Sequence, residues 1–124
     1  MLDDGQHVAF LDHRPLFHGH CLLIPREHRE TLLDLRRDEL APYFGTAQLL
    51  ARAVEESMDA KGTFVAMNNR VSQSVPHLHL HVVPRRPKDG LRGFFWPRTK
   101  YEDERQMGAV RDAVREAVER LAGG

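Results

Sequence analysis

The chain has 124 residues, the size of one ordinary domain, and its 18 Lys and Arg residues balance its 18 Asp and Glu residues. Balanced charge gives no overall field that would attract a nucleic acid polymer or an acidic membrane surface. No apolar run approaches the roughly 20 residues that span a bilayer, and the N-terminus lacks the apolar core of a signal peptide. We therefore expect a cytoplasmic protein that forms a single domain over 1–124 and binds neither nucleic acid polymers nor membranes.

The first half of the chain predicts two strands and a helix. Residues 7–12 and 20–25 are short apolar runs between Gly, Asp and Pro residues, which is typical of strands. In 38–58 the apolar residues recur with a period close to 3.6, so we expect a helix there. Asp38 is the expected N-cap of this helix, and Pro42 is acceptable near its first turn.

The second half predicts two more strands and a second helix. The strands are expected over 63–68 and 77–84, with a polar loop between them. Residues 85–100 contain too many Gly, Pro and Arg residues for a regular element, and 102–121 again shows the helical period. Links of hairpin length predict an α+β fold in which an antiparallel sheet of about five strands packs with two helices.

Histidine is the residue type that stands out. The lone Cys21 excludes an internal disulfide and a cysteine-based zinc finger, and we expect it to be a buried strand residue. The eight histidines, in contrast, include two groups, His18–His20–His28 and His77–His79–His81. Because side chains of a strand alternate between its faces, the second group forms a row of imidazoles about 6.6 Å apart, opposite a row of apolar side chains.

Three interpretations fit this row. The histidines can be incidental surface residues, or two neighbours can share a metal ion with His20 or His28 as a further ligand. The third interpretation is nucleophilic catalysis, because a neutral imidazole attacks phosphorus near neutral pH. No HExxH motif or carboxylate cluster lies close in the sequence, so we expect no metal and no other cofactor.

The stretch "QSVPHLHLHVVPR" resembles the signature of the histidine triad (HIT) family, in which three histidines alternate with apolar residues. The stretches "AFLDHRP", "GHCLLIPREH" and "VAMNN" are similar to other parts of that family, so that the resemblance covers positions 7–86. It implies a HIT-like α+β fold and a two-fold homodimer. It also implies a hydrolase that cleaves nucleoside phosphoramidates or dinucleoside polyphosphates at the α-phosphorus through a nucleotidyl-histidine.

The resemblance also implies roles for individual residues. His79 would be the nucleophile, His77 would orient its neighbours, His81 would contact phosphate or assist the leaving group, and His28 would support the triad. A purine nucleotide would be bound by the residues that match the family's pocket, which are Asp12, Phe10, His13, Asn68, Gln73 and Ser74. Asn69 is an alternative to Asn68. The family often has glycine at the place of Ser72, which makes the phosphate loop of this chain a departure from the pattern.

Two other functions remain open beside hydrolysis. One is a nucleotide-binding regulatory module with slow or incidental turnover, and the other is a nucleotide phosphorylase or transferase of the same superfamily. Related transferases of sugar phosphates have glutamine at the third histidine, so that His81 favours hydrolysis. The segment 85–100 has six basic residues against Asp89 alone, and with Phe94, Phe95 and Trp96 it is a candidate rim for polyphosphates and bases.

Overall fold

The computed structural model describes residues 1–91 and 97–123. The chain divides into two compact units, Met1–Asp89 and Gly90–Gly124, and each is described by itself. The expectation of one domain over 1–124 stays a prediction. No helix in the described ranges is long and apolar enough to cross a membrane.

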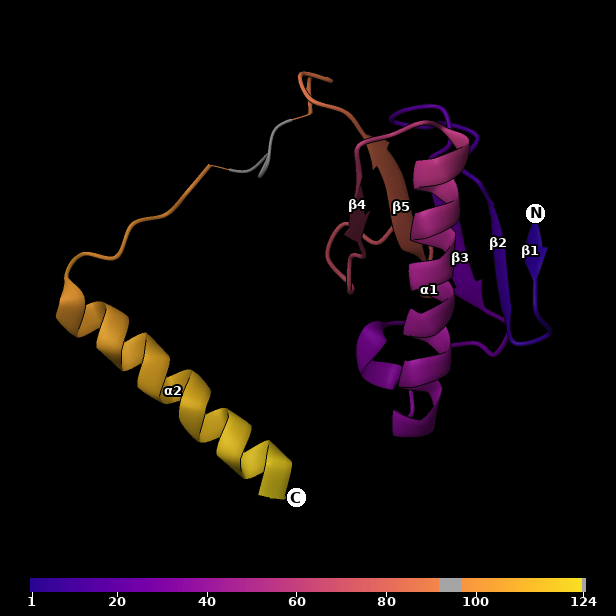
Figure 1. The fold of residues 1–124 in the computed structure, drawn as a ribbon. Helices are drawn as coiled ribbons and strands as arrows, with labels where there is room; N and C mark the ends of the chain where they lie inside the picture. Colours follow the sequence, from indigo (N-terminus) through magenta and orange to yellow (C-terminus); the bar gives the residue numbers. More distant parts are fainter. Residues whose placement is uncertain (92–96, 124) are drawn as a thin grey trace. The chain divides into compact units, whose positions relative to one another are not determined.

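The first unit is a five-stranded antiparallel sheet with one long helix on it (Figure 1). The strands are β1 Leu2–Asp3, β2 His7–Leu11, β3 Cys21–Pro25, β4 Gly62–Ala66 and β5 Leu80–Arg85. Their order in the sheet is β1-β2-β3-β5-β4, so β3 and β5 meet at its centre although they are far apart in the sequence. The short 3-10 helix η1 spans Leu32–Asp34 and the helix α1 spans Arg37–Ser57.

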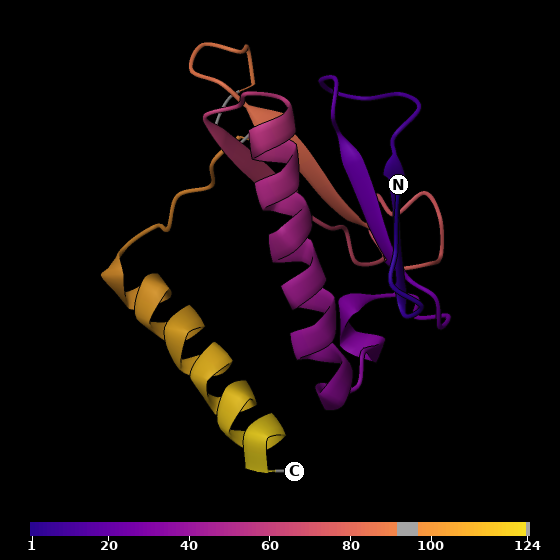
Figure 2. The ribbon, with the colours of Figure 1, turned by 45° about the vertical axis from the view of Figure 1, so that its right-hand side comes forward.

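Helix α1 covers one face of the sheet, as the turned view shows (Figure 2). Its buried side chains are Tyr43, Ala47, Leu50 and Val54, which recur at the helical period. They pack on inward side chains of β2, β3 and β5 and of the segment just before β5, namely Ala9, Cys21, Leu23, Leu78, Leu80 and Val82. Tyr43 also donates its hydroxyl proton to the Leu23 carbonyl oxygen at 2.9 Å, which ties the helix to the middle of the sheet.

The expected α+β class with five antiparallel strands and two helices is confirmed, but several boundaries differ, since β4 ends at Ala66 and not at 68. The N-cap of α1 is Arg36 and not Asp38, because the Glu39 carboxylate reaches back to accept the Arg36 backbone N–H at 2.7 Å. Two short elements, β1 and η1, were not predicted, since runs of two and three residues carry no periodicity.

The larger difference is that β5 begins at Leu80 and not at His77. Leu80 pairs with Leu23 of β3, so continuing the register would place Leu78 opposite Pro25. Proline has no backbone N–H and cannot continue the ladder. The chain before Leu80 is instead held by the Leu78 N–H, which donates to the Arg29 carbonyl oxygen at 2.7 Å.

The second unit contains helix α2, Glu104–Gly123, close to the expected span of 102–121. Met107, Val110, Val114 and Val118 recur along it with a spacing of three or four residues. Such spacing places them on one side of the helix, as the sequence predicted.

Candidate active site

The histidine row lies at the start of β5 and in the segment just before it. The apolar side chains of the alternation, Leu78, Leu80 and Val82, are buried under α1, while His77, His79 and His81 are partly exposed. The expected division of the strand into an apolar side and a histidine side is therefore present. Two further histidines reach the row from β3, with His20 just before that strand and His28 just after it.

His79 is held by the backbone of a neighbouring residue. Its Nδ1 atom lies 2.8 Å from the carbonyl oxygen of His77. A carbonyl oxygen only accepts hydrogen bonds, so Nδ1 carries the proton of the neutral ring and Nε2 keeps a bare lone pair. This is the tautomer in which Nε2 is a nucleophile.

His77 is fixed by the end of β3. Its Nε2 atom lies 2.8 Å from the carbonyl oxygen of Pro25, to which it donates its proton. The His28 ring stacks on it with centroids 5.3 Å apart and an interplanar angle of 24°. The Nδ1 atoms of the two rings are 3.4 Å apart, so His28 donates a long hydrogen bond to the bare Nδ1 of His77. These contacts hold His77 in place, and its backbone carbonyl oxygen is the group that orients His79.

His81 is oriented by His20, whose role the sequence did not reveal. The Leu16 backbone N–H donates to Nδ1 of His20 at 3.1 Å, so the proton of the neutral His20 ring is on Nε2. That proton is donated to Nδ1 of His81 over 2.9 Å. His81 consequently has its own proton on Nε2 and presents a hydrogen-bond donor beside His79, with the two rings 5.3 Å apart.

The pairing of β3 with β5 explains why His20 reaches His81. Leu22 pairs with His81 across β3 and β5, and His20 lies two residues before Leu22, on the same face. The sequence marked His20 only as one of two possible metal ligands, because the pairing of β3 with β5 is a long-range contact that no local pattern reveals.

Asp12 follows β2 and lies beside His20. Its Oδ1 accepts the Arg14 backbone N–H at 2.9 Å, the geometry of a turn, and its Oδ2 is 3.6 Å from His20 Nε2. Asp12 is therefore next to the histidine row, at a distance from His20 that permits electrostatic attraction but not a hydrogen bond. Its expected role with ribose hydroxyls stays a prediction.

The other residues expected to bind a nucleotide are distributed around the row. Phe10 is on β2, is 40% exposed and pairs with Leu22, so it shares the face of His81. His13 is exposed in the loop after Asp12. These positions are open to a ligand, and the roles of both residues stay predictions.

The loop before the row uses several of its polar groups to hold itself together. Gln73 donates to the Glu30 carbonyl oxygen at 2.6 Å and accepts from the Arg70 N–H at 2.8 Å. Asn68 Nδ2 donates to the Ser72 carbonyl oxygen at 3.4 Å, and Ser74 is exposed. Asn69, the alternative to Asn68, accepts the Leu32 N–H at 2.9 Å.

Ser72 adopts a backbone conformation that favours glycine. Its φ angle is 61°, in the left-handed region that a residue with a Cβ atom adopts only at a cost. The loop therefore keeps a glycine-like backbone turn without glycine.

Asp12, His20 and His81 also form a cluster whose ligand atoms lie within 4.8 Å of one another. If His20 Nε2 gave its lone pair to a cation, the ring proton would move to Nδ1. There it would face the Leu16 N–H, and two donors would oppose each other. The hydrogen bonds of His20 thus favour a neutral ring that donates to His81 over a metal ligand.

Several contacts tie the described start of the basic segment to the first unit, among them the Arg86 guanidinium, which donates to the Met58 carbonyl oxygen. Arg85 binds the Asp89 carboxylate with two hydrogen bonds of 2.6 and 3.1 Å. Arg98 and Lys100 are exposed. The expected contributions of Arg92, Phe94, Phe95 and Trp96 lie outside the described residues.

Burial sets the charge state of the His20–His81 pair. Burial lowers the pKa of both rings below the ordinary value of 6.5, and the charges of His20 and His79 lower that of His81 further. The unfolded chain therefore takes up these protons near pH 6.5, while the folded chain takes them up only at lower pH. The contribution of this pair to the free energy of unfolding is fully present above pH 6.5 and is lost as the pH falls below that value.

We expect His20→Gln to reduce this loss of stability. The glutamine Nε2 keeps a donor toward His81 but cannot be protonated in this range. Urea unfolding at about pH 7.5 and about pH 5.5 should show a smaller decrease in the free energy of unfolding for the variant than for the wild type. An equal decrease in both proteins would show that His20 is not the buried neutral group assigned to it.

Comparisons with known proteins show what this chain is similar to. The family model of the HIT domain matches residues 1–88. An uncharacterized HIT-like protein of Mycobacterium tuberculosis is 38% identical over 91 residues, which are 72% of this chain and 63% of that protein. The asymmetrical bis(5'-nucleosyl)-tetraphosphatase of Schizosaccharomyces pombe is 31% identical over 84 residues, 66% of this chain and 46% of that protein.

Solved structures give the same result. A zinc-bound histidine triad family protein from Mycobacterium smegmatis has a TM-score of 0.68 and 33% identity, covering 95% of this chain and 84% of that one. The chain spans less than two thirds of the length of the curated relatives named above. The family model, however, matches well over half of the chain, and this establishes that the chain belongs to the HIT family.

Proposed function

We propose that the protein is a nucleotide hydrolase that cleaves at the α-phosphorus of dinucleoside polyphosphates or nucleoside phosphoramidates. The observation that carries this proposal is the set of hydrogen bonds around His79. They leave a lone pair on its Nε2 atom and place the N–H of His81 beside it. The tetraphosphatase activity named for the S. pombe relative supports the same class of substrate.

In the proposed reaction, Nε2 of His79 attacks the α-phosphorus of an anhydride. The N–P bond forms, the bond from phosphorus to the bridging oxygen breaks, and its electron pair leaves with the departing phosphate. The ring then carries a positive charge, which the carbonyl oxygen of His77 stabilises through the Nδ1–H. His81 donates from Nε2 to an oxygen of the transferring group, where negative charge is concentrated.

The second step returns the enzyme to its first state. Water attacks phosphorus, the N–P bond breaks, and its electron pair returns to Nε2 of His79, while the proton of water goes to solvent. If inorganic phosphate or another acceptor takes the place of water, the same intermediate gives a phosphorylase or transferase. A regulatory module would form or resolve the intermediate only slowly. Measuring the products with and without phosphate separates these alternatives.

The purine nucleotide and the homodimer remain parts of the proposal. Phe10 provides an exposed apolar surface beside the row for a base, and Asp12 provides a carboxylate for sugar hydroxyls. Strand β4 forms one edge of the sheet, with β5 as its single neighbour in the described part of the chain. An edge strand of this kind is a natural place for a second copy to pair.

Removing the proposed nucleophile should abolish turnover. We expect His79→Ala to lower kcat by about 10³-fold or more, because the covalent step has no substitute group, while nucleotide binding persists. Wild-type protein quenched in base, where the N–P bond persists, during turnover of a radiolabelled dinucleoside polyphosphate should carry a nucleotidyl group on His79. Label on another histidine, or near-normal turnover of His79→Ala, would contradict the assignment.

Metal-dependent catalysis is the second candidate, since Asp12, His20 and His81 can present ligand atoms to one ion and the M. smegmatis relative is described as zinc-bound. We propose that catalysis needs no metal, because the Leu16 N–H holds His20 as a donor to His81. Activity should survive exhaustive chelation, with metal content measured on the same sample. Loss of activity on chelation that zinc restores would favour the metal site instead.

A further inference from the structure

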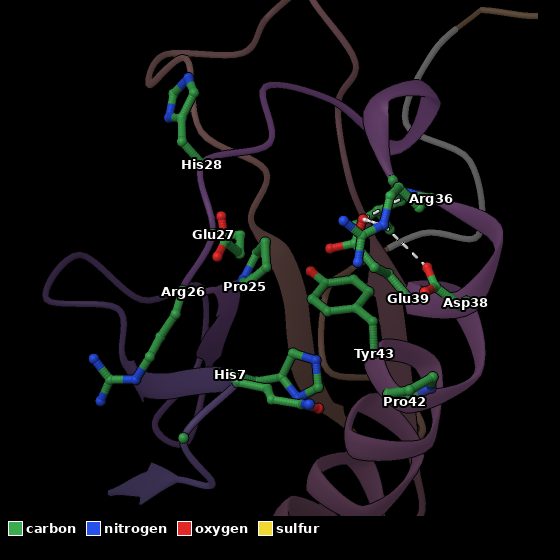
Figure 3. A pocket seen from close by; sticks show the side chains of 13 residues that line it. His7, Pro25, Arg26, Glu27, His28, Arg36, Asp38, Glu39, Pro42 and Tyr43 are labelled. Atoms are coloured by element: carbon green, nitrogen blue, oxygen red, sulfur yellow. Dashed lines mark hydrogen bonds and ion pairs between the residues drawn. The ribbon is translucent and has the colours of Figure 1, made fainter.

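A pocket lies in the first unit, on the other side of the sheet from the histidine row. It is a cavity of about 540 Å³, within the range of about 300–1,000 Å³ typical of small-molecule sites. Its walls come from the start of β2, the end of β3 with the residues that follow it, and the beginning of α1 (Figure 3). His7 and Pro25 pair across β2 and β3 on the face that α1 covers, whereas His81 pairs with Leu22 on the opposite face.

His7 forms the floor of this cavity and is 95% buried, with 5% of its surface exposed. Its Nδ1 atom lies 3.0 Å from Oδ2 of Asp4 and 3.2 Å from Oγ1 of Thr46. The hydrogen bond with His7 is the main cause that holds the pKa of Asp4 well below its ordinary value, so Asp4 is a carboxylate that only accepts. Nδ1 of His7 therefore carries a proton.

The second ring nitrogen of His7 has no such partner. No hydrogen bond reaches its Nε2 atom from the residues that the structure describes. Within those residues no fully enclosed side-chain nitrogen or oxygen is left unpaired, so Nε2 keeps some accessible surface, and His7 lines the cavity. In the neutral ring this atom is a bare acceptor. A donor bound in the cavity would complete the hydrogen bonding of the His7 ring.

The charges of the lining point to the kind of donor. Arg26 is paired with Asp3. Arg36 is paired with Asp38 and Glu39, and Figure 3 shows these three side chains together along one wall. Glu27 forms no ion pair or hydrogen bond with any residue in the described ranges. The lining thus contains three carboxylates and two guanidinium groups, an excess of one negative charge, and Glu27 is the carboxylate without a described partner, so the cavity favours positive charge.

The remaining walls are apolar or aromatic. Leu35, Pro25 and Pro42 line the cavity together with Tyr43, whose ring centroid lies 5.6 Å from that of His7. Aliphatic walls suit a short hydrocarbon chain.

We propose that this cavity binds a small organic cation, a primary alkylammonium that donates protons to His7 Nε2 and to the Glu27 carboxylate and lays its hydrocarbon chain against Leu35, Pro25 and Pro42. The site is independent of the proposed hydrolase activity. It is nevertheless connected to the histidine row, because Pro25 and His28 line the cavity while the Pro25 carbonyl and the His28 ring hold His77.

The test is a titration of the full chain with pentylamine at about pH 8, where an ordinary imidazole is neutral and an alkylamine is protonated. Two-dimensional ¹H–¹⁵N NMR follows the backbone and the imidazole nitrogens. We expect saturable one-to-one binding, a shift of the His7 Nε2 resonance, and smaller shifts at His28 and His77. Pentanol, which has the same chain without the charge, should bind at least about tenfold more weakly, as expected for the loss of a charge-assisted hydrogen bond.

Two variants assign the contacts. His7→Asn keeps a donor where Nδ1 meets Asp4 but removes the Nε2 acceptor, and Glu27→Gln removes the charge of an exposed side chain. Each should weaken pentylamine binding by about tenfold, whereas Glu55→Gln, an exposed carboxylate on α1 outside the cavity, should not.

Several results would overturn the proposal. They are an absence of saturable binding, equal affinity for pentanol, or unchanged affinity in Glu27→Gln. If His7→Asn does not fold, Glu27→Gln still decides the matter, because its side chain is on the surface. The hydrolase assignment is unaffected by any of these results, since it depends on His79 and on the opposite face of the sheet.

Discussion

The proline that ends β3 is the constraint on which the site depends. Pro25 pairs with His7 on one side but offers no N–H to the strand on the other side, so the ladder between β3 and β5 stops at Leu23 and Leu80. The chain before Leu80 is released from the sheet just where His77 and His79 lie. The carbonyl oxygen of Pro25 is then available to accept the Nε2 proton of His77. Because Pro25 lacks an N–H, the end of β3 binds the His77 side chain in place of a neighbouring strand.

The orientation of the histidine rings is set by hydrogen bonds to backbone groups, each of which can act only as a donor or only as an acceptor. Backbone carbonyl oxygens accept from His77 and His79, and a backbone N–H donates to His20, which in turn donates to His81. Each backbone group is fixed as a donor or an acceptor, so each ring has one favoured neutral tautomer. The result is a bare nitrogen on His79 next to an N–H on His81. Below the row, the buried leucines and α1 hold the strand rigidly in place.

Much of this was predictable from the sequence, and the failures share a cause. The alternation of leucine and histidine located the row, and helical periodicity located α1 and α2 within two residues at each end. The position of the N-cap of α1 was missed because it depends on the Glu39 side chain folding back to Arg36. The role of His20 was missed because it depends on which strand lies beside β5. Local sequence patterns predict which residues share a face of a helix or strand. Contacts between residues far apart in the chain can be predicted only when the order of the strands in the sheet is known.

The most direct test of this account is the tautomer of each histidine, measured by long-range ¹H–¹⁵N NMR of the imidazole rings at about pH 8, where ordinary imidazoles are neutral. The account predicts that His79 carries its proton on Nδ1, while His20, His77 and His81 carry theirs on Nε2. A protonated Nε2 on His79 in the folded protein would remove the lone pair from the proposed nucleophile and contradict the central claim.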